Sequence, residues 1–99
     1  MARPITGAMA AIRWRYFEAA RLEQYRVVHE DDRWSLRARV ISHNAYNLAQ
    51  SDLMLIAPHQ AGAWYWPILE WTISGQTLTA RLGPPIDRQE DYGRSLRTA

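Results

Sequence analysis

The clearest structural signal in this 99-residue chain is the stretch Trp34-Ser35-Leu36-Arg37-Ala38-Arg39-Val40-Ile41. Apolar and polar side chains alternate along it, which is typical of a β-strand with one buried and one solvated face. Residues 25–29 also read as a strand, and the polar run at 30–33 between the two segments indicates a turn. The pattern therefore predicts a hairpin with Arg37 and Arg39 on its solvated face.

Three more strands are expected in the second half of the chain. Residues 52–57 form a short, continuous apolar run, which is typical of a central strand buried on both faces. Residues 64–82 read as a second hairpin, because Gly75 supplies the positive φ that a tight turn needs. The small and polar residues 42–51 indicate a connection, with one helical turn around residues 45–49.

The N-terminal segment, residues 6–24, carries two conflicting patterns. Strong helix formers fill residues 17–24, and Thr6 is a suitable N-cap. Five apolar residues also share one arc of a helical wheel: Met9, Ile12, Tyr16, Ala19 and Ala20. The alternation over residues 12–16 is instead that of a strand, so residues 8–17 fit either element. We predict one amphipathic helix.

The predicted fold is α+β, with an antiparallel sheet of four to five strands packed against one N-terminal helix. Two hairpins and a central strand make up the sheet. Residues 1–85 form a single α+β domain, since a chain of this length supports only one core. Residues 86–99 are polar and charged, and we expect them to form a flexible C-terminal tail.

The composition excludes several classes of protein and site. Cysteine is absent, which excludes disulfides and zinc–thiolate sites and favours a reducing compartment. No apolar run approaches the roughly 20 residues that span a bilayer, so we expect a cytoplasmic protein without a membrane partner. The net charge of +2 is too small to indicate a strongly basic nucleic-acid binder.

No motif indicates catalysis, a cofactor or a metal. His29, His43 and His59 stand far apart, without the short spacing that presents two metal ligands from one element. Neither a nucleophile motif nor a glycine-rich phosphate loop is present. We therefore expect a non-enzymatic protein without cofactor. An enzyme with an unrecognised spatial site is a third hypothesis, after two kinds of binding protein.

The aromatic run Trp64-Tyr65-Trp66 is the most suggestive candidate site. Adjacent residues of a strand point to opposite faces, so at least one of these rings is expected near the surface. Exposed Trp and Tyr are enriched at binding hot spots. We predict a protein-binding module, an inhibitor, adaptor or complex subunit of the kind that phages and mobile elements encode. Trp64, Tyr65 and Trp66 would be its anchors, with Arg37 and Arg39 at the rim.

Two further uses of these residues are considered. Isologous strand pairing through the same aromatic edge would make a homodimer. Alternatively, Arg26, Arg37 and Arg39 on one sheet face, together with a stacking aromatic, would bind nucleic acid. The acidic turn at residues 30–32 lies on the same hairpin and argues against this alternative.

Overall fold

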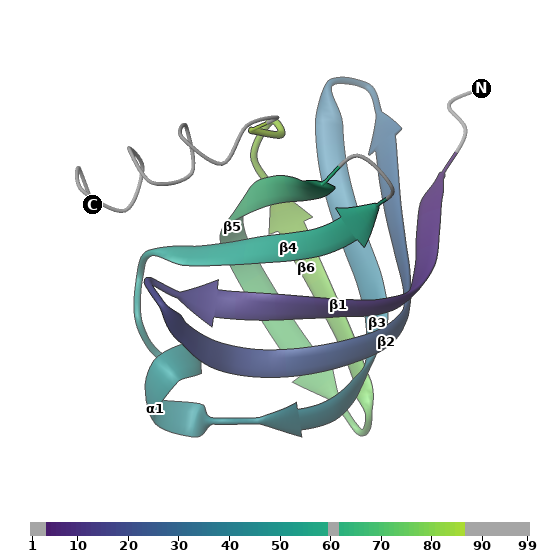
Figure 1. Cartoon of the computed structure of the whole chain (residues 1–99). Coiled ribbons are helices and arrows are strands. Elements are labelled where there is room, and N and C mark those ends of the chain that lie inside the picture. Colours follow the sequence, from purple (N-terminus) through teal and green to yellow (C-terminus); the bar gives the residue numbers. More distant parts are fainter. Residues whose placement is uncertain (1–3, 60–61, 87–99) are drawn as a thin grey trace.

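Six antiparallel strands form a closed barrel in the computed structural model, which describes residues 4–59 and 62–86 (Figure 1). The elements in chain order are β1 (Ile5–Trp14), β2 (Phe17–Glu30), β3 (Arg33–His43), α1 (Ala45–Leu48), β4 (Leu53–His59), β5 (Gly62–Ser74) and β6 (Thr77–Leu82). Around the barrel, the strands follow the order β1-β2-β3-β6-β5-β4. Strand β4 returns beside β1 after the β1–β2–β3 meander, which is the Greek-key arrangement.

The predicted α+β fold with an N-terminal helix is wrong. The segment predicted as that helix, residues 6–24, forms most of β1, a tight turn at residues 15–16, and the first half of β2. A register shift between Ile12 and Arg13 inserts an extra residue into the pairing of β1 with β2. Ala19 and Ala20 are therefore both buried although they are adjacent. This irregularity interrupts the two-residue period of a strand and imitates the apolar arc of a helix.

The remaining elements are close to their predicted positions. The β2–β3 hairpin, the single turn of helix at α1, strand β4 and the β5–β6 hairpin are all present. Asp31 and Asp32 have φ values of 52° and 59°, so both central residues of the β2–β3 turn are left-handed, as in a type I′ turn. Residues 87–99 of the predicted tail lie outside the described residues.

The barrel interior is apolar, and none of the described polar or charged residues is buried. Trp66 is its largest fully buried side chain. Helix α1 packs against β2 at one end of the barrel and contributes the buried Leu48 (Figure 1). Two asparagines fix this helix: the Asn44 side chain accepts a hydrogen bond from the Asn47 N–H, and Asn47 Nδ2 donates to the Glu18 carbonyl oxygen.

A bend in β1 and β2 separates the barrel body from the β2–β3 hairpin tip. Gly7 lies opposite Tyr25, and a Cβ at Gly7 would stand only 2.6 Å from the Tyr25 ring. Next to this pair, Gln24 has a φ of 52° at a register shift between β2 and β3. Glycine therefore allows the Tyr25 ring to cover the neighbouring backbone at the bend. The resulting burial raises the pKa of Tyr25 above its ordinary value of 10.0.

Candidate functional site

The predicted anchors Trp64, Tyr65 and Trp66 lie on β5, where the structure divides them between core and surface. Trp66 is completely buried, whereas Trp64 and Tyr65 are partly exposed. The Trp66 ring lies 6.1 Å from that of Trp34 and 6.0 Å from that of Trp64. We call Trp34, Trp64 and Trp66 the core tryptophans. A direct contact between Trp66 and a partner would require the barrel to open.

The aromatic stretch of β5 is not an open sheet edge. Its residues pair with β4, where Trp66 lies opposite Leu55. On its other side, the Tyr65 carbonyl oxygen accepts a hydrogen bond from Ile86 N at 2.6 Å. Among the described residues, both sides of the stretch therefore have strand-like neighbours. The strand pairing considered for a homodimer has no open edge at this place.

A second group of aromatic residues lies beside α1, where sequence reasoning predicted no site. We call Trp14, Tyr16, Phe17 and Tyr46 the aromatic patch. The Trp14 ring stacks on Phe17 with 5.8 Å between ring centroids, and it meets the edge of Tyr46 at 6.0 Å. Tyr16, Tyr46 and Phe17 are 75%, 69% and 57% exposed, respectively. Trp14, Phe17 and Tyr46 therefore form a contiguous aromatic surface, and Tyr16 is exposed in the adjoining turn.

Local backbone structure brings the aromatic patch together. Trp14 ends β1 and Phe17 begins β2, so the two residues face each other across the tight turn. Within that turn, Arg15 has a φ of 56°, a left-handed conformation that is uncommon for a residue other than glycine. Its guanidinium carbon lies 5.3 Å from the Trp14 ring centroid, a cation–π distance. Helix α1 supplies Tyr46 from a distant part of the sequence.

A third feature is a row of polar residues across the outer face of five strands. In register order from β1 to β5, the row consists of Thr6, Arg26, Arg37, Thr79 and Thr72, all of which are exposed. We call it the arginine row. The predicted proximity of Arg26 to Arg37 is confirmed, since the two residues lie directly opposite each other on β2 and β3. Neither has an ion-pair partner within the described part of the chain.

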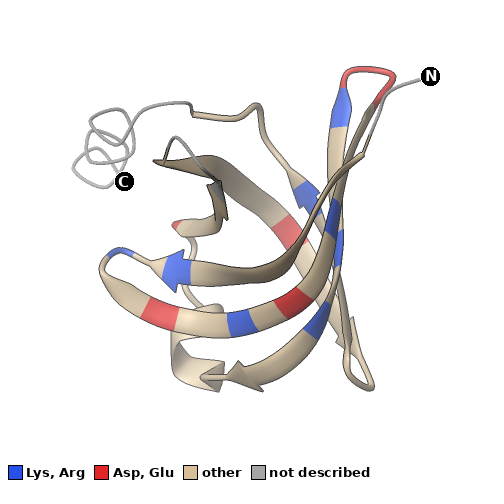
Figure 2. Ribbon diagram, turned by 45° about the vertical axis from the view of Figure 1, so that its right-hand side comes forward, with Lys and Arg blue, Asp and Glu red and all other residues tan. Residues whose placement is uncertain are grey.

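The arginines beside this row are paired with acids. Arg39 contacts Glu23 at 3.3 Å, and Arg81 contacts Glu70 at 3.1 Å. Figure 2 shows the basic segments of these strands below the acidic β2–β3 hairpin tip. The uncompensated charge on this face of the barrel therefore belongs to Arg26 and Arg37. The two predicted rim residues therefore differ in their pairing. Arg37 has no ion-pair partner within the described residues, whereas Arg39 is paired with Glu23.

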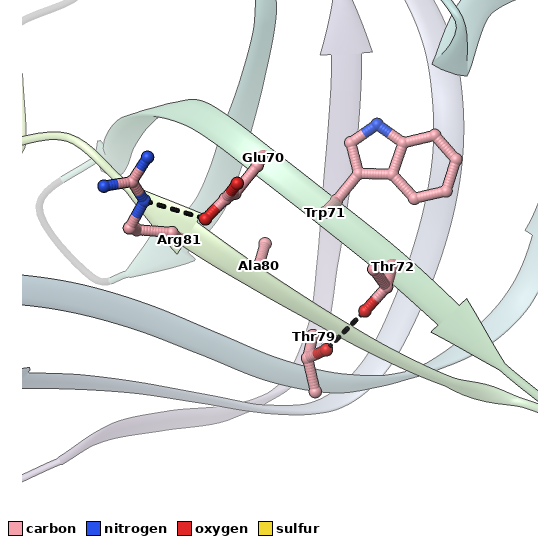
Figure 3. A pocket seen from close by; sticks show the side chains of 6 residues that line it. All are labelled: Glu70, Trp71, Thr72, Thr79, Ala80 and Arg81. Atoms are coloured by element: carbon pink, nitrogen blue, oxygen red, sulfur yellow. Dashed lines mark hydrogen bonds and ion pairs between the residues drawn. The ribbon is translucent and has the colours of Figure 1, made fainter.

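A shallow hollow of about 370 Å³ adjoins the end of the arginine row. It is lined by Glu70, Trp71, Thr72, Thr79, Ala80 and Arg81. Figure 3 shows Glu70 directed toward Arg81 and Thr72 toward Thr79, whose hydroxyl oxygens are 2.9 Å apart, while Trp71 extends away from both pairs. The only carboxylate of the hollow is thus paired with an arginine. The arrangement suits a polar contact surface better than acid–base catalysis.

Residues 4–59 and 62–86 offer neither a metal cluster nor a membrane-spanning helix. No group of three or more potential metal ligands lies together among them. No helix in this part of the chain has the length and apolar character needed to cross a bilayer. A comparison of the whole sequence and fold with protein-family models, curated proteins and solved structures finds no match.

Sequence reasoning missed the aromatic patch because it placed residues 14–17 inside a helix. A usable signal was present, since Trp14-Arg15-Tyr16-Phe17 contains three large aromatic residues within four positions. Neither a strand nor a helix of this small domain can direct all of them into one core. The stretch is therefore comparable to Trp64-Tyr65-Trp66, and here the structure leaves Tyr16 and Phe17 exposed while Trp14 packs partly buried against the core. Nothing local in the sequence indicates that Tyr46 joins them.

Proposed function

We propose that this chain is a non-enzymatic protein-binding module, an inhibitor, adaptor or complex subunit, that contacts its partner through the aromatic patch. The observation that carries the proposal is the continuous contact of Trp14 with Phe17 and Tyr46 on the protein surface. Large exposed aromatic groups are costly to leave in water and are typical of interface hot spots. This surface replaces the Trp64–Trp66 run as the proposed anchor, because Trp66 is buried.

The energetics of the patch support tight binding by few residues. A Phe, Tyr or Trp side chain buries about 150–250 Å² in an interface, and full burial of one such group stabilises a complex by about 1.5–3 kcal/mol. The rings already contact one another, so docking a partner immobilises little additional side-chain freedom. Arg15 adds a charged group of the type enriched at hot spots. A few such residues can therefore supply most of the binding energy of a larger interface that surrounds the patch.

The packing of the patch favours a protein partner over stacked nucleobases. Base stacking requires an accessible, flat ring face. The Trp14 ring has Phe17 stacked at 5.8 Å, the Tyr46 edge at 6.0 Å and the Arg15 guanidinium at 5.3 Å. The central ring of the patch is therefore largely covered, and the exposed rings around it are tilted against it rather than parallel to it. Apolar rings of irregular orientation with an adjacent guanidinium instead complement the mixed surface of a folded protein.

The test compares capture of partners by the immobilised chain and its variants in a lysate of the source cells. A partner protein retained by the parent chain should be lost with Phe17→Ala and with Tyr46→Ala. The matched control is Leu69→Ala, which removes another exposed apolar side chain, 56% exposed, from the β5 bulge. Equal retention by the parent chain and both patch variants would overturn the proposal, as would equal loss with Leu69→Ala.

Sedimentation of the pure chain over a range of concentrations asks whether the partner is a second copy. A dimer that Tyr46→Ala dissociates and Leu69→Ala leaves intact would identify the patch as a homodimer contact. A monomer at all concentrations would exclude a second copy as the partner.

A further inference from the structure

The pair Arg26 and Arg37 is an unusual feature for a sheet surface. Side chains directly opposite each other on antiparallel strands lie close together, with Cβ atoms about 4.5–5.5 Å apart. Like charges at such positions repel each other and destabilise the sheet. Opposite charges at this position would stabilise the sheet. The same face contains two such ion pairs, Glu23–Arg39 and Glu70–Arg81.

The neighbours of the two arginines do not neutralise them. Along the row, each is flanked by a threonine, Thr6 beside Arg26 and Thr79 beside Arg37. The acids of the adjacent rows are engaged by other arginines. The row thus combines two adjacent guanidinium groups with hydroxyl donors on both sides. Guanidinium and hydroxyl groups are the side chains that contact phosphate oxygens of nucleic-acid backbones.

The side chains around the two arginines fit a nucleic-acid duplex better than a single strand. Outward positions of β2, β3 and β6 around the two arginines are occupied by Glu23, Val28, Ser35, Arg39, Thr77 and Arg81. None of these six residues is aromatic, and the aromatic patch lies at the other end of β2. In the hollow beyond Thr79, Trp71 is an aromatic lining residue, but its ring extends away from the threonines and the Glu70–Arg81 pair (Figure 3). Single strands are held largely by stacking of bases on aromatic rings. A duplex presents phosphates while its bases stay paired, so it needs no stacking surface.

We propose that the arginine row is a binding site for the phosphate backbone of a nucleic-acid duplex. This contact uses a different face from the aromatic patch and stands independently of the protein-binding proposal. Arg26 and Arg37 would each hold phosphate oxygens, and Thr6 and Thr79 would donate hydrogen bonds beside them. The sequence predicts a nucleic-acid site that combines these arginines with a stacking aromatic residue. Because the aromatic patch lies at the other end of β2, the proposed site consists of the arginines and threonines without it.

The acidic hairpin tip limits the extent of the contact. Glu30, Asp31 and Asp32 follow Arg26 on the same hairpin, beginning four residues later, at a strand distance of about 13 Å. Their charge repels phosphates beyond the row. With about two phosphates neutralised, the logarithm of the association constant should fall with the logarithm of salt concentration with a slope of about −1.8. Affinity should therefore drop about 12-fold between 50 and 200 mM salt.

The experiment is a fluorescence anisotropy titration of the full chain into a short labelled DNA duplex at several salt concentrations. The double variant Arg26→Gln, Arg37→Gln should abolish the salt-dependent binding. The matched control is Arg13→Gln, Arg21→Gln, which removes the same amount of charge from exposed positions at the β1–β2 end of the barrel. This control should retain most of the affinity and the slope.

A third variant separates binding from folding. Arg37→Glu places an opposite charge next to Arg26 and creates a cross-strand ion pair, so the barrel should melt at the same temperature as the parent or higher. Duplex binding should nevertheless be lost. Three results would overturn the proposal: no duplex binding at low salt, equal loss of affinity in the row variant and its control, or tighter binding of the unpaired strand than of the duplex.

Discussion

The core tryptophans and the aromatic patch both bring large aromatic rings together at almost the same spacing. Trp66 lies 6.0 and 6.1 Å from its two neighbours, and Trp14 lies 5.8 and 6.0 Å from its own. Their surroundings differ, because Trp66 is fully enclosed by strands whereas Phe17 and Tyr46 are mostly exposed. Ring contact alone thus does not identify a binding site. The solvent exposure of the contacting rings separates a structural cluster from one available to a partner.

The largest expected loss of stability comes from a substitution among the core tryptophans. Trp66→Ala removes the largest fully buried side chain and should lower the free energy of unfolding by about 3–5 kcal/mol. Because small domains have only about 5–15 kcal/mol in total, thermal unfolding should shift strongly or the variant should fail to fold. Differential scanning calorimetry measures the shift. A loss below about 1 kcal/mol would contradict the enclosed position of Trp66.

The indole nitrogen of Trp66 adds a detail to this prediction. Trp66 Nε1 is buried and has no hydrogen-bond partner among the described residues. Leaving such a donor unpaired costs about 1–3 kcal/mol. Trp66→Phe removes the donor together with part of the ring, so the two effects oppose each other. Its stability should therefore be clearly closer to that of the parent chain than that of Trp66→Ala.

How far the sequence predicts these regions depends on the regularity of the strands. Strand β3 was predicted because Leu36, Ala38 and Val40 alternate without interruption and all point inward. The same hairpin places Arg26 beside Arg37 through local pairing alone. In β1 and β2, register shifts near Ile12 and after Glu23 disturb the period, and strong helix formers obscure what is left of it.

The aromatic patch could not be predicted for a further physical reason. The contact between Trp14 and Tyr46 joins a strand end to a helix that follows two more strands. The contact depends on both the pairing of β1, β2 and β3 and the packing of α1 on β2. A pattern read along neighbouring residues contains no information on such a contact. Alternation did indicate that Trp64 and Trp66 share a face, but not which face is inside.

The stability of the barrel should also depend on pH through Tyr25. Burial raises its pKa in the folded chain above the value of 10.0 that it has when unfolded. Ionisation above pH 10 therefore favours the unfolded state, so stability should be intact below that pH and decline as pH rises toward the folded pKa. The decline is at most about 1.4 kcal/mol per pH unit for one group. Urea unfolding at several pH values measures it.

Tyr25→Phe is the control for this prediction. It keeps the ring that covers Gly7 but removes the ionisable hydroxyl. The decline of stability above pH 10 should become shallower than in the parent chain. An unchanged profile would mean that Tyr25 does not contribute, and that other groups dominate the alkaline limit.

A substitution in the arginine row should raise the free energy of unfolding, whereas a substitution in the core lowers it. Arg37→Gln removes a like-charge contact with Arg26 and should raise the free energy of unfolding by about 0.2–1 kcal/mol. Urea denaturation at low salt measures the gain, which should shrink as salt screens the repulsion. A loss of stability would show that the two guanidinium groups do not repel each other. The pair would then be no argument for an anionic partner.

An equally small effect on folding should come from the aromatic patch. Tyr46→Ala removes a side chain that is 69% exposed, so only its edge contact with Trp14 is lost. The free energy of unfolding should change by no more than about 0.5–1 kcal/mol, as measured by calorimetry. A ring that contributes little to stability and is still held against Trp14 is available for a partner. If Tyr46→Ala instead destabilised the barrel as strongly as Trp66→Ala, the patch would be an outer part of the core, and the difference between the two clusters would disappear.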